Sequence, residues 1–293
     1  MIGKKRWAAY GIGISLLLGG CADSDNTPQF QDQYERVQDY KGEGYSLNNG
    51  EENDKIAEAH RKEIEQAVKT FFLENYKTEV KVHNLVGNVD GVTVFVESTG
   101  PVHLYTYAIV SLNEDTIVDG VRTQEGEVER GIREGLYRLV LEKEFHQLGA
   151  YLEKVASEHK VVGRTIESLQ NVGGSGHMTP YYSLSSLKDD EAIKPVYDLY
   201  MENPKTKVKR LKEAYEAQAF EADMLRINIM LFMEEENVPP SEKVMEKVAR
   251  DLQDLESIPP GTYRVAVNDN GVHKESFEGF KDNSVEEEVI LTD

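Results

Sequence analysis

The sequence predicts an α+β protein in which a mainly antiparallel sheet of about five strands packs with about six helices. Two long stretches, residues 53–76 and 126–159, carry apolar side chains at helical spacing. Between them, residues 80–112 alternate apolar with polar side chains, as strands do. Strands therefore come together and helices cluster after them, which favours an α+β arrangement over regular strand-helix alternation.

The first predicted helix, residues 53–76, presents one apolar face to the core. That face consists of Ile56, Ile64, Ala67, Val68, Phe71 and Phe72. Two antiparallel strands should follow, one through Val80 and Val82 and one starting near Val92, because Asp90-Gly91 is a favoured hairpin turn. A third strand over residues 102–112 is apolar or aromatic on both faces, so we expect it to be central.

The second helical stretch, residues 126–159, is expected to divide near Glu144 or Gly149. An ordered glycine-rich loop is predicted over residues 171–186. The remaining elements are, in order, helices over 189–202 and 205–220, a strand over 225–233, a helix over 241–255 and a strand over 263–267. The density of Met and Leu in residues 225–233 leaves a helix open as the alternative there.

The N-terminus has the layout of a cleavable signal peptide over residues 1–20. Lys4, Lys5 and Arg6 precede an uncharged apolar run over residues 7–20. As a helix, this run would reach about 21 Å, well short of the roughly 30 Å hydrocarbon core of a bilayer. A membrane-spanning helix is therefore the weaker interpretation.

The apolar run ends in Leu18-Gly19-Gly20-Cys21, which matches the bacterial lipobox. This match predicts cleavage between Gly20 and Cys21 and an S-diacylglycerol group on Cys21, with N-acylation of the new terminus left open. The expected location is the cell membrane, lipid-anchored, on its extracytoplasmic face. The alternative is a chance cysteine in an ordinary secreted or tethered chain. Cys21 is the sole cysteine, so the body cannot contain a disulfide.

Four regions are predicted along the chain. They are the signal peptide 1–20, a lipidated and flexible acidic tether 21–52, one α+β domain 53–280 and an unstructured acidic tail 281–293. Tyr34, Tyr40 and Tyr45 could dock part of the tether on the body. Two lobes meeting near the glycine-rich loop are the alternative to one domain. Removing residues 1–20 deletes three positive charges and no negative ones, so the formal net charge of -20 becomes -23. Such a body repels phosphates, and nucleic acid is not an expected partner.

The glycine-rich loop is the candidate ligand-binding segment. It contains Gly173, Gly174 and Gly176, and is followed by Tyr181 and Tyr182 as an aromatic wall. The sequence around Ser175 lacks the second glycine of a nucleophile elbow and the Gly-Lys-Ser/Thr ending of a phosphate loop. The alternative to a ligand loop is a connector that leads into a strand.

Other chemistry has no clear sequence signal. The histidines at 60, 83, 103, 146, 159, 177 and 273 are far apart, and no second cysteine is present. We therefore predict no metal site and no cofactor, and nominate no catalytic residue. Asp269-Asn270-Gly271 lacks the calcium-loop pattern and is read as a β-turn. Tyr105 and Tyr107 share a strand face that could stack on a sugar, although such a face more often belongs to the core.

Several strings of residues resemble a family of Gram-positive lipoproteins of staphylococci and bacilli, a conserved domain of unknown function. The strings are Val37-Gln38-Asp39-Tyr40 with Gly42-Glu43-Gly44, Val80-Lys81-Val82-His83-Asn84, Thr123-Gln124-Glu125-Gly126, Asn171-Val172-Gly173-Gly174 and Lys281-Asp282-Asn283-Ser284. The resemblance covers nearly the whole chain after the signal peptide. It implies the lipidated Cys21, and it implies no activity, cofactor or catalytic residue.

Three functions are consistent with these observations. The leading hypothesis is a non-catalytic surface lipoprotein whose acidic body binds an envelope component, a protein partner or a small ligand. The second is a solute-binding lipoprotein of a transporter, for which two lobes of strand-helix alternation are expected. The third is an envelope hydrolase that uses scattered acids with His83, His177 or Ser175.

Overall fold

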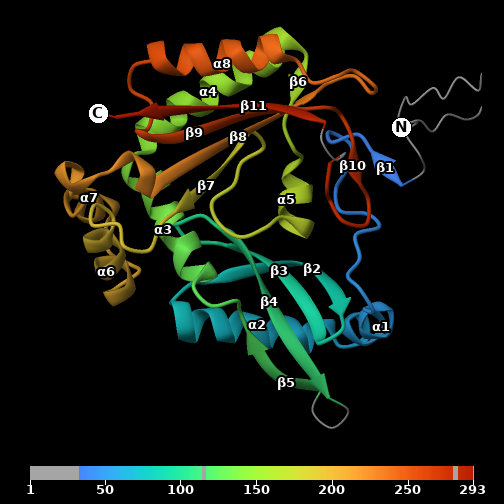
Figure 1. The fold of residues 1–293 in the computed structure, drawn as a ribbon. Coiled ribbons are helices and arrows are strands. Elements are labelled where there is room, and N and C mark those ends of the chain that lie inside the picture. The colour runs from blue at the N-terminus through green and yellow to red at the C-terminus, as the bar shows by residue number, and fades with distance from the viewer. Residues whose placement is uncertain (1–32, 114–116, 280–282, 293) are drawn as a thin grey trace, which may run out of the picture.

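The computed structural model describes residues 33–113, 117–279 and 283–292. These residues form eight α-helices, two short 3-10 helices and eleven strands in three sheets (Figure 1). The predicted α+β class is therefore confirmed. Gly20 and Cys21, with the rest of the predicted signal peptide, lie outside the described residues. No helix within the described ranges has both the length and the apolar character needed to cross a bilayer.

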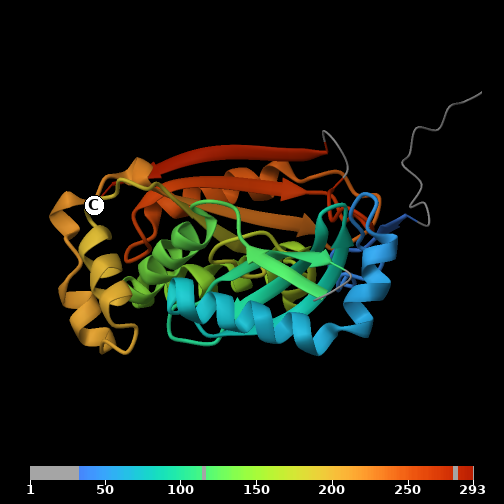
Figure 2. The ribbon, with the colours of Figure 1, turned by 90° about the horizontal axis from the view of Figure 1, so that it is seen from below.

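The first half of the chain builds a four-stranded antiparallel sheet. Its order is β2 (Val80–Asn88), β3 (Gly91–Ser98), β4 (Tyr105–Asn113) and β5 (Ile117–Arg122). The helix α2 (Arg61–Tyr76) packs along one face, and α1 (Glu51–Ala59) lies beside β2 (Figures 1 and 2). At the predicted hairpin turn, Gly91 has a φ of 138°, and a Cβ there would lie 2.1 Å from the carbonyl oxygen of Val110. The turn therefore requires glycine.

The second half builds a five-stranded sheet. Its order is β11 (Ser284–Leu291), β9 (Gly261–Asn268), β8 (Leu225–Met233) and β6 (Val161–Val162), with β7 (Tyr182–Ser186) also paired to β8. The strands β8 and β9 are parallel, and α8 (Glu242–Asp254) connects them; the other strand pairs of this sheet are antiparallel. Parallel neighbours need such a crossover, because a short turn cannot return the chain to the same end of the sheet.

The other helices lie between the two sheets, at one end of the molecule, or beside α8 on the five-stranded sheet (Figure 1). They are α3 (Glu127–Val140), α4 (Glu142–His159), α5 (Ile166–Val172), α6 (Lys194–Glu202) and α7 (Val208–Glu213), with 3-10 turns at Ala217–Ala219 and Ala222–Met224. The helix α3 contacts β4 of one sheet and β7 of the other. One buried apolar cluster accordingly runs through both sheets and includes Val94, Leu136 and Ile229. Layers joined in this way bury their apolar faces against each other.

The N-terminal segment is docked on the body from residue 34 onward, which corrects the prediction of a flexible tether for residues 34–52. The strand β1 (Tyr34–Glu35) pairs with β10 (Val272–His273). Tyr40 is fully buried; its ring stacks on Phe277 with a centroid separation of 5.4 Å, and its hydroxyl donates to the carbonyl of Lys274. The burial of apolar and aromatic side chains offsets the entropy of ordering this polar segment.

The predicted unstructured tail, residues 281–293, is also corrected, because residues 284–291 form the edge strand β11. Val289 is buried and packs into the main core. On the opposite face, Glu286 and Glu288 form ion pairs with Arg264 and Arg226 of neighbouring strands. The period-two pattern of β11 could not be recognised from its acidic composition. The acids on its outer face are paired with arginines that lie far away in the sequence.

Several element boundaries differ from the predictions. The helix predicted over residues 53–76 breaks at His60, and the second long helix breaks at Leu141. His60 and Leu141 both have a positive ψ, which is outside the α-helical range. Glu144 and Gly149, where the second break was predicted, lie inside α4. The loop predicted over residues 171–186 is shorter than expected, because α5 ends at Val172 and β7 begins at Tyr182.

Candidate functional site

The glycine loop, residues 173–181, crosses from α5 to β7 over the start of β4. Two backbone hydrogen bonds hold it, from the amide of Tyr105 to the Gly176 carbonyl at 2.9 Å and from the amide of Gly176 to the Tyr105 carbonyl at 2.8 Å. Gly176 has a φ of 121°, and a Cβ there would lie 2.0 Å from Oε2 of Glu134. Glycine is therefore required both by the backbone conformation and by the carboxylate beside it.

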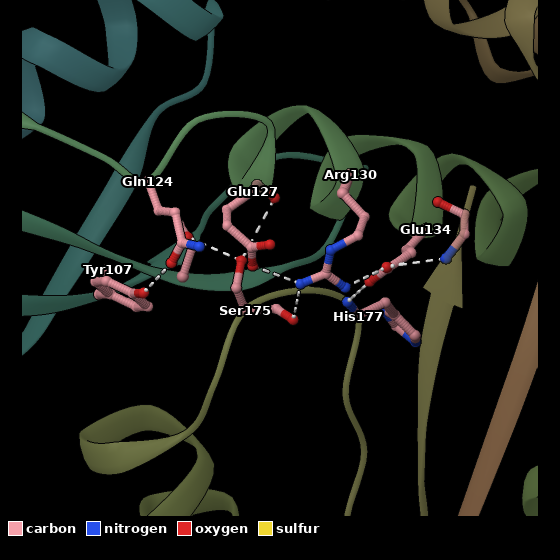
Figure 3. Close-up of polar contacts among 9 residues, drawn as sticks. Tyr107, Gln124, Glu127, Arg130, Glu134, Ser175 and His177 are labelled. Carbon is pink, nitrogen blue, oxygen red and sulfur yellow. Dashed lines mark hydrogen bonds and ion pairs between the residues drawn. The ribbon is translucent and has the colours of Figure 1, made fainter. Parts of the chain in front are cut away.

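Glu134 is the fully buried acid at the centre of this contact (Figure 3). Its Oε1 accepts hydrogen bonds from Nη1 of Arg130 at 2.7 Å and from the amide of Ser186 at 3.2 Å, while Oε2 accepts from the amide of His177 at 3.0 Å. Burial raises the pKa of Glu134 to about 7, against the lowering effect of Arg130 and the two amides. One carboxylate therefore joins α3 to the loop and to β7.

Arg130 extends the contact toward solvent. Its Nη2 donates to Oε2 of Glu127 at 2.6 Å and to the carbonyl of Ser175 at 3.2 Å (Figure 3). The Ser175 hydroxyl lies 3.1 Å from that of Thr106. We call Glu127, Arg130, Glu134, Ser175 and His177 the polar junction. Its outer edge is continued by Tyr107, whose hydroxyl donates to Gln124 at 3.2 Å.

His177 and Tyr182, at the inner end of the loop, face the core. The Nδ1 of His177 lies 3.0 Å from the carbonyl of His103, and burial lowers the pKa of His177 to about 3, so its ring is neutral. Tyr182 stacks on Phe145 with a centroid separation of 5.9 Å and also contacts the ring of His177. Tyr181 is only partly buried, and its carbonyl accepts from the amide of Met230. The two tyrosines predicted as an aromatic wall thus have different surroundings.

The three candidate glycines also differ. A Cβ on Gly173 would lie 2.3 Å from the carbonyl oxygen of Leu169, whereas a Cβ on Gly174 would meet nothing within 4 Å. Gly173 and Gly176 are therefore fixed by close packing, and Gly174 is not. The loop as a ligand-binding segment stays a prediction.

A second polar cluster surrounds Glu97 on β3. Its two carboxylate oxygens lie 2.9 Å from Nε2 of His103 and 2.9 Å from Nε2 of His83, and Gln170 of α5 donates to it at 3.2 Å. Burial by itself would raise the pKa of Glu97, but the hydrogen bonds from His103 and His83 hold it below its ordinary value. Burial lowers the pKa of His83, and its bond to Glu97 opposes this. The ring of His103 contacts Tyr105 and His177, so this cluster adjoins the polar junction.

The sequence pattern does not single out Glu134, Arg130 or the Glu97 cluster. Charges at positions 127, 130 and 134 have the spacing of an ordinary solvated helix face. The available signal was the two glycines in α3, Gly131 and Gly135, which let other chain segments approach that helix: a Cβ on Gly135 would lie 2.9 Å from the carbonyl oxygen of His103. A helix with such glycines is closely covered on that side.

Three of the strings that carry the family resemblance meet in space. The side-chain amide of Asn84 donates to the Asn171 carbonyl at 3.1 Å, and the side-chain amide of Asn171 donates to the Lys41 carbonyl at 2.8 Å. A Cβ on Gly42 would lie 2.9 Å from Cβ of Asn171. Strand β2, helix α5 and the N-terminal segment are therefore joined through Asn171.

The donor set does not suggest a metal centre. In the described ranges, no group of three or more His, Cys, Asp or Glu side chains is arranged to hold a metal ion. Glu97 instead accepts hydrogen bonds from both of its histidines. These residues build a hydrogen-bonded cluster between strands and helices.

A solved structure of another protein has a similar fold. The crystal structure of a DUF1672 family protein from Staphylococcus aureus matches with a TM-score of 0.73 at 18% identity, covering 89% of this chain and 99% of that one. A DUF5037 family protein from Ruminococcus gnavus matches with a TM-score of only 0.28 at 9% identity, covering 78% of this chain and 92% of that one. No curated protein matches in sequence. The model of the family described as "Protein of unknown function (DUF1672)" matches residues 27–291, and the chain therefore belongs to the DUF1672 family.

Proposed function

We propose that this protein is a lipid-anchored binding module on the extracytoplasmic face of the membrane, and that it catalyses no reaction. The lipobox Leu18-Gly19-Gly20-Cys21 supports the anchor. Twelve residues separate Cys21 from Tyr34, where the described fold begins its first strand. Fully extended, they span about 40 Å, enough to hold the acidic body clear of lipid headgroups.

The polar junction is the observation that carries the binding role. A general acid or base must exchange a proton with a substrate. Glu134, the buried acid of the junction, instead accepts three hydrogen bonds from its own chain, and His177 is kept neutral inside the core. These groups fix the glycine loop to α3 and β7, which favours a rigid surface for recognition over a reactive cleft.

The two rival functions have less support. The Ser175 hydroxyl lies against Thr106, and the Nδ1 atom of His177 against the carbonyl of His103, so a hydrolase would need both side chains to leave these partners. A transporter solute-binding protein was expected to have two lobes of strand-helix alternation. In the described residues, β8 and β9 are the one parallel pair.

The anchor is tested by expressing the full chain and its Cys21→Ser variant in a Gram-positive host. We expect the wild-type chain in the membrane and detergent phase, with an intact mass that lacks residues 1–20 and includes diacylglycerol. The variant should lose the lipid mass and leave the detergent phase. A wild-type product that keeps its leader, or has a bare thiol and accumulates in the medium, would overturn the anchor.

The non-catalytic role is tested separately, with residues 22–293, which contain every described residue. This chain is incubated with peptidoglycan fragments, esters and peptides, and the products are followed by mass spectrometry. We expect all substrates to stay intact. Turnover at enzymatic rates that Glu134→Gln or His103→Asn abolishes would contradict the proposal.

A further inference from the structure

A cavity lies between the exposed side of α3, the segment before α6, and α6 itself. Its volume is about 390 Å³, within the range of small-molecule sites. Glu129 and Arg133 line it from α3, Lys188 from the preceding segment, and Tyr197 from α6. We call it the α3–α6 pocket. It lies on α3 beside the polar junction and uses none of the junction's residues.

Two charged side chains of the pocket, one of each sign, have a shielded atom without a partner among the described residues. The Oε2 atom of Glu129 and the Nε atom of Arg133 are shielded from solvent and have no hydrogen-bond partner among the described residues. Glu129 and Arg133 are four residues apart on α3, yet they form no ion pair with each other. By contrast, Arg130 and Glu134, with the same spacing on the same helix, are bonded at 2.7 Å. Shielded charges without partners are costly unless a ligand or solvent satisfies them.

The aromatic ring of Tyr197 lies near the guanidinium group of Arg133. The guanidinium carbon of Arg133 lies 5.9 Å from the ring centroid of Tyr197, which holds the planar group in a defined position. Burial, and next the negative charge of Glu129, raise the pKa of Tyr197, so this acid also lies close to the ring. A guanidinium and a carboxylate thus both lie near one aromatic ring.

These contacts define the chemistry of the ligand. A guanidinium recognises a carboxylate, and a carboxylate recognises an ammonium group. A ligand with only one of these charges would leave the other protein group unpaired. We propose that the α3–α6 pocket binds a zwitterionic amino compound, a free amino acid or short peptide, with its carboxylate at Arg133 and its ammonium at Glu129. This inference rests on the proposed binding function and names the ligand class.

The position of the pocket suits an anchored protein. The helix α6 lies at the opposite end of the molecule from β1, where the N-terminal segment enters, in both views (Figures 1 and 2). If the lipid is on Cys21, this end is the one farther from the anchored segment. Ligands of the surrounding medium or envelope would therefore reach the pocket without crossing the lipid surface.

The proposal is tested by isothermal titration calorimetry of residues 22–293 with alanyl-alanine. Two analogues serve as ligand controls: N-acetyl-alanyl-alanine lacks the ammonium group, and alanyl-alanine amide lacks the carboxylate. We expect saturable binding of alanyl-alanine, and affinities at least about tenfold lower for each analogue, because each leaves either Glu129 or Arg133 without an opposite charge. The variants Glu129→Gln and Arg133→Gln should each weaken alanyl-alanine binding by at least about tenfold.

Glu246 and Arg250 supply the matched protein control. They are also four residues apart and exposed, on α8, away from the pocket. Glu246→Gln and Arg250→Gln should bind alanyl-alanine as the wild type does, and circular dichroism confirms that every variant is folded. Absence of saturable binding, or equal binding by the pocket variants or by the analogues, would overturn the pocket. Mass spectrometry of the same samples tests the non-catalytic role separately. Cleavage of the dipeptide would overturn that role and leave the binding proposal standing.

Discussion

At the scale of single residues, Glu134 and Glu127 show how one arginine can serve two different carboxylates. Both bond to Arg130, at 2.7 Å and 2.6 Å. Glu134 is fully buried, whereas the Glu127 side chain is 27% exposed. An exposed pair contributes little to stability, but the loss of one partner from a buried pair leaves an uncompensated charge. The same arginine therefore permits a direct comparison of the two environments.

Glu134→Ala is expected to lower the free energy of unfolding by about 3–5 kcal/mol, because it leaves the Nη1 atom of Arg130 and two backbone amides without an acceptor. Glu134→Gln keeps one acceptor and should cost less. The control Glu127→Gln should cost at most about 1 kcal/mol. Urea unfolding followed by far-ultraviolet circular dichroism measures all three. Equal losses for Glu127→Gln and Glu134→Ala would show that the buried acid does not hold the loop.

The buried ring of His177 predicts a dependence of stability on pH. Its pKa is lowered to about 3 in the folded protein, below about 6.5 in the unfolded chain. Between these two pKa values, the unfolded state therefore binds a proton on this ring and the folded state does not. This contribution to stability is complete above about pH 6.5 and falls by about 1.4 kcal/mol per pH unit as the pH drops toward 3.

His177→Phe should remove this pH dependence of stability between about pH 6 and 4. It should also lower the free energy of unfolding equally at every pH, because the hydrogen bond is missing. His146→Phe, which changes an exposed histidine on α4, should leave the slope unchanged. The raised pKa of Glu134 acts in the opposite direction, so the quantity to compare is the difference between wild type and variant at each pH. An unchanged slope in His177→Phe would contradict the burial argument.

At the scale of elements, the sequence was informative wherever apolar periodicity was local. It predicted α2, the β2–β3 hairpin, β8, α8 and β9, since each carries its own pattern. It missed β11 and assigned residues 34–50 to a tether that Tyr34, Tyr40 and Tyr45 could only partly dock, because acidic or polar composition outweighed a few decisive side chains such as Tyr40 and Val289. In the candidate site it found the glycine loop but not Glu134, whose role depends on contacts with Gly176 and His177 more than forty residues away.

The edge strand β11 allows a test of whether a few apolar side chains hold an acidic segment in the fold. Val289 is 4% exposed and packs into the core, whereas its neighbour Ile290 points to the other face and is 62% exposed. Val289→Ala is expected to lower the free energy of unfolding by about 2 kcal/mol, and Ile290→Ala by less than about 0.5 kcal/mol. Denaturant titration measures the free energy of unfolding of both variants. Similar small effects at both positions would mean that β11 is not part of the folded core.

At the scale of the whole molecule, two sheets of different topology share one apolar core. The helix α3 contacts both of them, with Leu136 buried in the shared cluster, and the polar junction closes the same interface with hydrogen bonds. With no disulfide available, this shared core must supply most of the stability. A body held in this way presents the α3–α6 pocket on a rigid support, and the two halves should not unfold independently.

Cooperative unfolding is tested with one core valine from each sheet. Val94 of β3 and Val265 of β9 are both fully buried, and Val89, at the turn after β2, is 70% exposed. We expect Val94→Ala and Val265→Ala each to lower stability by about 2 kcal/mol and Val89→Ala to have little effect. Hydrogen exchange with mass spectrometry then follows peptides from both sheets in every variant. If the halves form one cooperative unit, each core variant speeds exchange in β2–β4 and in β8–β9 together. Faster exchange confined to the substituted sheet would instead show two independently stable lobes, and would remove the argument that the polar junction couples them.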